Sequence, residues 1–286
     1  MSAGYPIDLH THSIASDGAL TPTELIARAA ERGVRIQALA DHDTLLGVAE
    51  AVAEGERRGV RVIPATELNT ESEWGDVHVL AYFVDPHDAA LEERLRELRD
   101  NRGRRIDMMV EKLNALGIPI TFDEVLQQSA GGAVGRPHIA RALMARGVVH
   151  DFRDAFARYL GGSGAAFVPK DKLSLVDAIA IAHEAGALAI WAHPGDAGRR
   201  ERLEPLIAAG LDGVEIRHPG HSRDDMKRLQ ALCEFFDLVP SGGSDWHGGD
   251  EGPRRLGAMS VPADWLEQQD AKVASVSAAA ESATWR

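Results

Sequence analysis

The chain has very little cysteine and no long apolar run. Cys233 is the single cysteine among 286 residues, so no internal disulfide can form, which agrees with a reducing compartment. We expect a buried helix residue there and not a nucleophile. No stretch approaches the roughly 20 apolar residues that span a bilayer, and no basic and apolar leader opens the chain. These absences argue against a membrane protein and favour a cytoplasmic one.

Positive charge is also in short supply. The chain has 31 Lys and Arg against 44 Asp and Glu, and its formal net charge is -13. Extended nucleic-acid surfaces work by neutralising many phosphates with basic side chains, so the sequence argues against such a surface. A small anionic ligand still fits, provided that bound metals or local basic residues supply positive charge.

Seven short apolar runs are typical of β-strands. They cover residues 7–9, 36–40, 60–65, 77–83, 187–192, 213–216 and 238–241. Helical patterns separate most of these runs. The first helix, residues 22–32, has Thr21 as its expected N-cap, Pro22 at its first position and Glu24 in a capping-box position. The alternation of strands and helices predicts an α/β barrel or a wound sheet.

The alternation stops in the middle of the chain. Residues 92–105 are highly charged, and further helices are predicted near 122–128, 137–146 and 151–159. We interpret residues 88–172 as a helical insertion that caps the substrate site, in a barrel made of residues 1–87 and 173–265. Residues 266–286, which end in SVSAAAESATWR, show little pattern and are predicted to form a loosely held tail.

Histidine and carboxylate residues recur at the strand ends, and this placement is the strongest signal in the sequence. His10 and His12 follow the first strand with one residue between them, so they point the same way in extended chain and can share a metal. If the third and fourth strands form a hairpin, Glu67 and His78 meet at one rim. Barrel active sites are built at such strand ends. The other residues of this kind are Asp17, Asp41, His42, Asp43, His193, His218, Asp245 and His247.

Each of these residues also has an ordinary structural interpretation. A single histidine at a strand end is more often hydrogen-bonded than metal-bound, and SDG or DHD alone favours a turn. The combination of HTH, TE followed by VH, AHP and SDWH in one chain favours a metal site instead.

The motifs DLHTHS, SDG, ADHD, ATE, VHVL, AHP and GSDWH together resemble the polymerase and histidinol phosphatase (PHP) family over essentially the whole chain. The resemblance implies a distorted seven-stranded (β/α)7 barrel that holds two or three divalent ions, with Mn²⁺ expected first and Fe²⁺ or Zn²⁺ as alternatives. It implies one ion on His10, His12, Glu67 and Asp245, a second on Glu67, His78 and His193, and a third on Asp17, His42 and His247.

Phrases in the insertion, NRGRRIDMMVEKL, GRPHIARAL and FVPKDKLS, are similar to those of the nucleoside 3',5'-bisphosphate phosphatases, whose relatives trim short RNA 5' ends. This resemblance implies in-line attack of a metal-bridging hydroxide on the 3'-phosphate, which leaves a 5'-nucleotide and phosphate. The absence of a GxxxxGK pattern agrees with chemistry that needs no P-loop. The alternatives are an exonuclease on short 5'-phosphorylated oligonucleotides, a histidinol phosphatase and a non-catalytic metal-binding module.

Three residues are candidates for the catalytic step, and basic residues of the insertion are candidates for the second phosphate. Asp245 is the catalytic ligand, while His218 and Asp43 lie outside the implied ligand set and are left for proton delivery or for orienting other groups. In the insertion a glycine-rich loop enters a helix, which suits anion binding. The predicted substrate contacts are Arg102, Arg105, Arg136, His138, Lys170 and His218, although a solvated face is the default for the arginines near residue 102.

Overall fold

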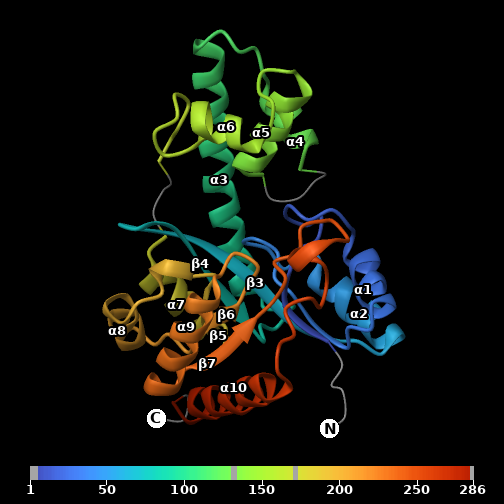
Figure 1. Ribbon diagram of the computed structural model, residues 1–286, viewed down its shortest axis with the longest axis vertical. Helices are drawn as coiled ribbons and strands as arrows, with labels where there is room; N and C mark the ends of the chain where they lie inside the picture. Colours follow the sequence, from blue (N-terminus) through green and yellow to red (C-terminus); the bar gives the residue numbers. More distant parts are fainter. Residues whose placement is uncertain (1–5, 130–133, 170–172, 284–286) are drawn as a thin grey trace.

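The barrel is made of seven strands that hydrogen-bond in sequence order. A computed structural model describes residues 6–129, 134–169 and 173–283 (Figure 1). The strands are β1 (Ile7–Thr11), β2 (Ile36–Leu39), β3 (Arg61–Ser72), β4 (Gly75–Tyr82), β5 (Leu188–Ala192), β6 (Gly213–Arg217) and β7 (Val239–Gly242). Each coincides with a predicted apolar run, and the predicted distorted (β/α)7 barrel is confirmed.

The direction of the strands changes twice around the barrel. β1, β2 and β3 are parallel, β4 is antiparallel to both of its neighbours, and β5, β6 and β7 are again parallel. A parallel bridge between Thr11 and Trp246 brings the end of β1 beside the segment that follows β7. The predicted hairpin of β3 and β4 is present, but β3 runs on to Ser72, well past the apolar run.

Helices cover the outside of the barrel. α1 and α2 lie on one side of it, and α7, α8 and α9 lie on the other (Figure 1). The predicted cap of α1 is confirmed, because the Thr21 side chain accepts from the Glu24 amide and the Glu24 side chain accepts from the Thr21 amide. The bounds of these helices are α1 (Pro22–Glu31), α2 (Val48–Arg58), α7 (Leu175–Glu184), α8 (Arg200–Ala208) and α9 (Arg223–Phe236), with short helical turns at η2 (Gly195–Ala197) and η3 (Gly252–Arg254).

The region between β4 and β5 forms a helical layer on top of the barrel. Its elements are α3 (Ala89–Ala115), α4 (Phe122–Gln127), α5 (Arg136–Ala145), α6 (Phe152–Ala155) and the π-helical turn η1 (Phe156–Leu160). The long α3 rises out of the barrel and the shorter helices pack beside its far half (Figure 1). Leu91 and Leu95 of α3 belong to the barrel core, whereas Ile106 and Leu113 belong to a second hydrophobic core within the insertion. The insertion therefore packs around a core of its own.

The C-terminal segment corrects one prediction. The expected unpatterned tail is instead the helix α10 (Ala263–Ala283), which lies under the barrel (Figure 1). Trp265 and Leu266 are buried, and the Gln269 side-chain amide donates to the Pro240 carbonyl over 2.7 Å. Packing against the barrel stabilises a helix whose own sequence has little amphipathic pattern. In the described part of the chain, no helix combines the length and the apolarity needed to cross a membrane.

Candidate metal centre and active site

All of the predicted metal ligands meet at one rim of the barrel. β1 contributes His10 directly, and His12 follows it at the strand end, while β3 and β4 contribute Glu67 and His78. The remaining ligands lie on loops that follow strands at the same rim, namely Asp17, His42, His193, Asp245 and His247.

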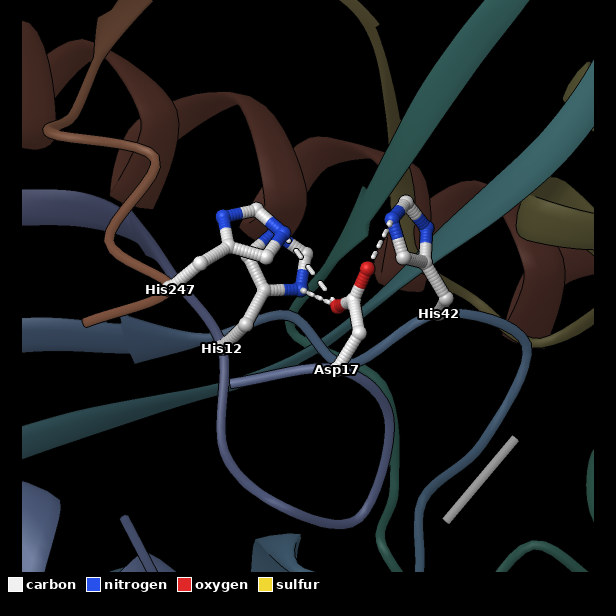
Figure 2. A group of neighbouring side chains, drawn as sticks. All are labelled: His12, Asp17, His42 and His247. Carbon is white, nitrogen blue, oxygen red and sulfur yellow. Dashed lines mark ion pairs between the residues drawn. The ribbon is translucent and has the colours of Figure 1, made fainter. Parts of the chain in front are cut away.

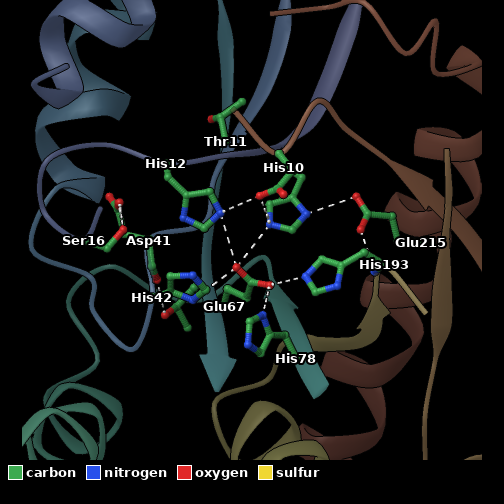
Figure 3. A network of polar contacts seen from close by, with 12 residues as sticks. His10, Thr11, His12, Ser16, Asp41, His42, Glu67, His78, His193 and Glu215 are labelled. Carbon is green, nitrogen blue, oxygen red and sulfur yellow. Dashed lines mark hydrogen bonds and ion pairs between the residues drawn. The ribbon is translucent and has the colours of Figure 1, made fainter. Parts of the chain in front are cut away.

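Glu67 lies at the centre of the cluster and is almost completely buried (Figure 3). Its Oε2 atom is 3.3 Å from Nε2 of both His10 and His12. Its Oε1 atom is 2.8 Å from His78 Nδ1 and 3.0 Å from His193 Nε2. One carboxylate thus faces two groups of histidines, one with each oxygen, as a ligand shared by two ions would.

Asp245 divides its two oxygens in a similar way. Oδ1 lies 3.6 Å from His10 Nε2 and 3.4 Å from His12 Nε2, on the inner side of the cluster. Oδ2 lies 3.2 Å from His218 Nε2 and 2.7 Å from Arg254 Nη1. His218 and Arg254 therefore hold the outer oxygen and leave the inner one directed at the histidines.

A third group surrounds Asp17 (Figure 2). Asp17 Oδ1 is 3.2 Å from His247 Nε2 and 3.9 Å from His12 Nδ1, and Asp17 Oδ2 is 3.9 Å from His42 Nε2. One donor atom from each of these four residues lies within 4.8 Å of the others. His12 thus has one ring nitrogen directed toward this group and the other toward Glu67 and Asp245.

The side chains fit divalent cations by two criteria. Two donor atoms bound tetrahedrally to one ion at ~2.1 Å are ~3.4 Å apart, and the contacts among His10, His12, Glu67 and Asp245 span 3.3 to 3.6 Å. In addition, His12 is fully buried, and neither of its ring nitrogens makes a hydrogen bond of normal geometry with another described residue, although Nε2 lies 3.3 Å from Glu67 and 3.4 Å from Asp245. Buried nitrogens without partners are costly, and a cation would satisfy them. Nitrogen and carboxylate donors suit transition metals such as Mn²⁺, Fe²⁺ and Zn²⁺.

The charges of the cluster are strongly coupled. Burial opposes the charged form of His12, but Asp245 and Glu67 outweigh it and raise the pKa of His12 to about 10. Burial lowers the pKa of His42 well below its ordinary value in spite of Glu67 and Asp17. Burial opposes the charge of Glu67 and Asp245 too, yet neighbouring histidines hold both carboxyl pKa values well below the usual range. The carboxylates are therefore ionised, which is the state that binds metals.

Two buried carboxylates outside the implied ligand set hold ligands or the loops that contain them. Glu215 on β6 contacts His10 and the backbone of His193 (Figure 3). Asp41 accepts from the hydroxyls of Ser13 and Ser16, each over 2.6 Å, and shapes the loop after β1. Sequence reasoning noted Asp41 and missed Glu215. The available signal was a charged residue within the apolar strand sequence GVEIR.

A cavity of about 230 Å³ lies between the cluster and the insertion. Asp17, His42 and His78 line it on the barrel side. On the side of the insertion the lining includes Arg105, Arg136, His138 and Phe156. Three of the predicted metal ligands and three of the predicted substrate contacts thus face the same space.

The basic residues of the insertion differ in how they are held. Arg105 is buried and its Nε donates to the Val168 carbonyl over 2.7 Å. Arg136 pairs with Asp76 and lies over the Phe156 ring, with 5.4 Å between its guanidinium carbon and the ring centre. Other predicted contacts have less structural information: His138 accepts from the Gly135 amide, Arg102 belongs to α3 with its side chain undescribed, and Lys170 lies outside the described residues.

The two candidates for proton delivery occupy different positions. The Gly220 amide donates to His218 Nδ1 over 3.0 Å, so Nε2 carries the proton and donates to Asp245. His218 is not among the described residues that line the cavity, and its contacts favour the orienting interpretation. Asp43 does line the cavity, and its two oxygens accept from the backbone and the side chain of Asn69.

Known proteins resemble this chain over most of its length. A 3',5'-nucleoside bisphosphate phosphatase of Chromobacterium violaceum is 40% identical over 260 residues, which cover 88% of this chain and 90% of that protein. A 5'-3' exoribonuclease of Haemophilus influenzae is 38% identical and covers 84% of this chain, with 89% of that protein covered. The solved structure of a proposed metal-dependent phosphoesterase from Bifidobacterium adolescentis has a TM-score of 0.83 at 36% identity and covers 93% of this chain and 96% of its own.

These relatives and the metal-ligand motifs agree with the family comparison. The PHP domain model matches residues 8–160, which include the ligands from β1 to β4 and the helices α3 to α6 and η1 of the insertion. Phosphoester hydrolysis is the chemistry shared by the relatives named above. The chain belongs to the PHP domain family of metal-dependent phosphoesterases.

Proposed function

We propose that the protein is a phosphomonoesterase that removes the 3'-phosphate from nucleoside 3',5'-bisphosphates and releases a 5'-nucleotide and phosphate. The observation that carries this proposal is the shared cavity, which is lined by the implied ligands Asp17, His42 and His78 on the barrel side and by Arg105, Arg136 and His138 on the side of the insertion. A substrate with two phosphates can use both walls, whereas a simple monoester uses one. The 40% identity to a bisphosphate phosphatase supports the same assignment.

The nine residues of the implied ligand set would hold two or three divalent ions in the arrangement that the resemblance implies. Bound ions of this kind polarise phosphoryl oxygens, lower the pKa of water and stabilise charge on the leaving group. Asp17, His42 and His78 line the cavity, so the scissile phosphate would bind at this end of it.

The remaining residues of the site have positioning and binding tasks. His218 and Arg254 fix the outer oxygen of Asp245. Asn69 on β3 lines the cavity. Its side-chain amide donates to Asp43 and lies 3.1 Å from His42 Nδ1, so it links β3 to the loop after β2. Arg136, a planar cation suited to bidentate contact, would bind the 5'-phosphate.

A second candidate function is exonuclease activity on short 5'-phosphorylated oligoribonucleotides. The 38% identity to an exoribonuclease favours it. Arg105 and Arg136 would bind a terminal 5'-phosphate, and the residues that would hold the ions would then lie beside the next phosphodiester. The net charge of -13 argues against long nucleic acids as substrates.

A substrate panel separates these possibilities. The purified full chain, supplied with Mn²⁺, is assayed on adenosine 3',5'-bisphosphate, adenosine 3'-phosphate, a 5'-phosphorylated pentaribonucleotide, histidinol phosphate and p-nitrophenyl phosphate. We expect the highest kcat/KM on the bisphosphate, with the 5'-nucleotide as product. A higher value on the pentanucleotide would transfer the assignment to the exonuclease, and a higher value on histidinol phosphate would overturn both nucleotide assignments. No turnover of any substrate by metal-loaded protein would favour the non-catalytic module.

A further inference from the structure

We infer that Glu215 is a positioning residue of the metal centre, which aligns His10 through its ring and His193 through its backbone. The inference rests on the proposed metal-dependent function. Glu215 is part of β6 and is completely buried, and its carboxylate lies between the two histidines (Figure 3). It lies outside the implied ligand set and does not line the cavity in the described part of the chain.

The contact with His10 selects one tautomer of the ring. His10 Nδ1 is 3.1 Å from Glu215 Oε1, and an ionised carboxylate can only accept, so Nδ1 carries the proton. His10 Nε2 is then the nitrogen available to an ion, and it lies 3.3 Å from Glu67 Oε2 and 3.6 Å from Asp245 Oδ1. Glu215 thus presents the ligating form of His10 to the centre of the cluster.

The contact with His193 acts through the main chain. Glu215 Oε2 accepts from the His193 amide over 2.8 Å. His193 has a φ of 31°, in the left-handed region that residues with a Cβ atom rarely adopt. The bond to Glu215 helps to hold this backbone, and the ring of His193 then reaches Glu67 over 3.0 Å. One carboxylate on β6 therefore aligns a ligand on β1 and a ligand that follows β5.

Asp212 provides a matched control on the same part of the chain. It directly precedes β6, is also buried, and likewise accepts from one histidine ring and one backbone amide. Its partners are His183 Nε2 over 2.8 Å and the Ala189 amide over 3.0 Å. Both bonds go to Oδ2, and Lys272 Nζ lies 3.8 Å from Oδ1. The Ala189 amide lies at the opposite end of β5 from His193, so Asp212→Asn removes the charge of a buried carboxylate beside β6 without contact to the cluster.

The test compares Glu215→Gln with Asp212→Asn in the full chain. The two Glu215 bonds use different oxygens, so a glutamine in the same position would turn its NH₂ group, which cannot accept, toward either His10 or His193. After metal removal, each protein is titrated with Mn²⁺ alone, and binding is followed by electron paramagnetic resonance. We expect E215Q to bind Mn²⁺ about 10- to 100-fold more weakly than the wild type, and D212N to bind like the wild type.

Ring-nitrogen chemical shifts supply a readout that a general loss of stability would not move. In ¹⁵N spectra of the protein loaded with diamagnetic Zn²⁺, His10 should show a protonated Nδ1 in the wild type and in D212N, and a changed Nδ1 shift in E215Q, because the acceptor on Nδ1 is altered. If E215Q fails to fold, the Glu215→Asp variant is tested in its place. Aspartate keeps the negative charge, but its shorter side chain places the carboxylate farther from His10. Weaker Mn²⁺ binding than in the wild type is expected there too.

The outcomes separate this inference from the function on which it rests. Failure of the wild type to bind Mn²⁺ would remove the proposed metal centre itself. Binding by the wild type with equal affinity in the Glu215 variant, and unchanged His10 shifts, would overturn only the positioning task of Glu215. Equal weakening in D212N would also overturn it, because the effect would then belong to any buried carboxylate of this region.

Discussion

Replacing Arg136 should change substrate preference and leave the metal centre intact. Arg136 begins α5 and lines the cavity, opposite the ligands Asp17, His42 and His78. Its side chain is only 18% exposed, and it is held by Asp76 and by the Phe156 ring. A phosphate bound there would meet a guanidinium already oriented toward the cavity.

The size of the effect follows from the lost contact. A hydrogen bond to a charged group contributes about 1.5 to 3 kcal/mol, which corresponds to a 10- to 100-fold range in kcat/KM. We therefore expect Arg136→Ala to lower kcat/KM on adenosine 3',5'-bisphosphate by at least ~10-fold. Hydrolysis of p-nitrophenyl phosphate, which has no second phosphate, should barely change, and metal content should stay the same.

Two further variants make the assay specific. Arg146→Ala removes an arginine at the other end of α5, where it pairs with Glu124 and does not line the cavity, and it should behave like the wild type. Asp76→Asn weakens the ion pair and keeps Arg136, so bisphosphate activity should persist. Equal losses on both substrates in the Arg136 variant would refute the reasoning, because the second phosphate would then be bound elsewhere.

Other predictions concern Arg105, the metals, the ligands and the thiol. Arg105→Ala should also weaken bisphosphate hydrolysis selectively, and it should lower the melting temperature because the buried guanidinium bonds to Val168; unchanged kinetics and melting would contradict this. Chelation should abolish activity and Mn²⁺ should restore it, with two or three ions per active chain by elemental analysis, whereas full activity with less than one ion would exclude metal catalysis. His10→Ala or Asp245→Ala should lose turnover and keep the circular dichroism of a folded barrel, and near-normal rates would remove that residue from the ligand set. Burial raises the pKa of Cys233 to about 12, so native protein should react slowly with Ellman's reagent at pH 8. The thiol of the unfolded chain ionises near ~8.5. The stabilising effect of keeping Cys233 protonated in the fold is therefore complete below that pH and is lost as pH rises toward 12. Rapid labelling of native protein would contradict the buried thiol.

The sequence predicts the ligand cluster well because its pattern is local and repeated. Nearly every strand has a histidine or a carboxylate at one end of its apolar run, and a barrel brings such ends to one rim. The contact between Glu67 and His78 required only the correct hairpin of β3 and β4. The long extension of β3 to Ser72 was missed because NTES is polar, and pairing with β4 stabilises it.

Other features depend on tertiary contacts that a local pattern does not contain. Glu215 looks like an irregular residue in an apolar strand until His10 and His193 are placed beside it. The helix α10 has a weak amphipathic pattern and is held by Gln269 and its packing against the barrel. The partners of Arg136 come from β4 and η1, which are distant in sequence, so its side-chain contacts follow only from the fold.

The central claim is that the metal cluster and the insertion bind one nucleotide between them. A crystal structure of the full chain with Mn²⁺, phosphate and adenosine 5'-phosphate tests it most directly, because anomalous scattering locates the ions and density locates the nucleotide. The account predicts ions at Glu67 and its neighbours, phosphate beside them, and the 5'-phosphate of the nucleotide against Arg136. Ions at the cluster with the nucleotide bound away from the insertion would contradict it.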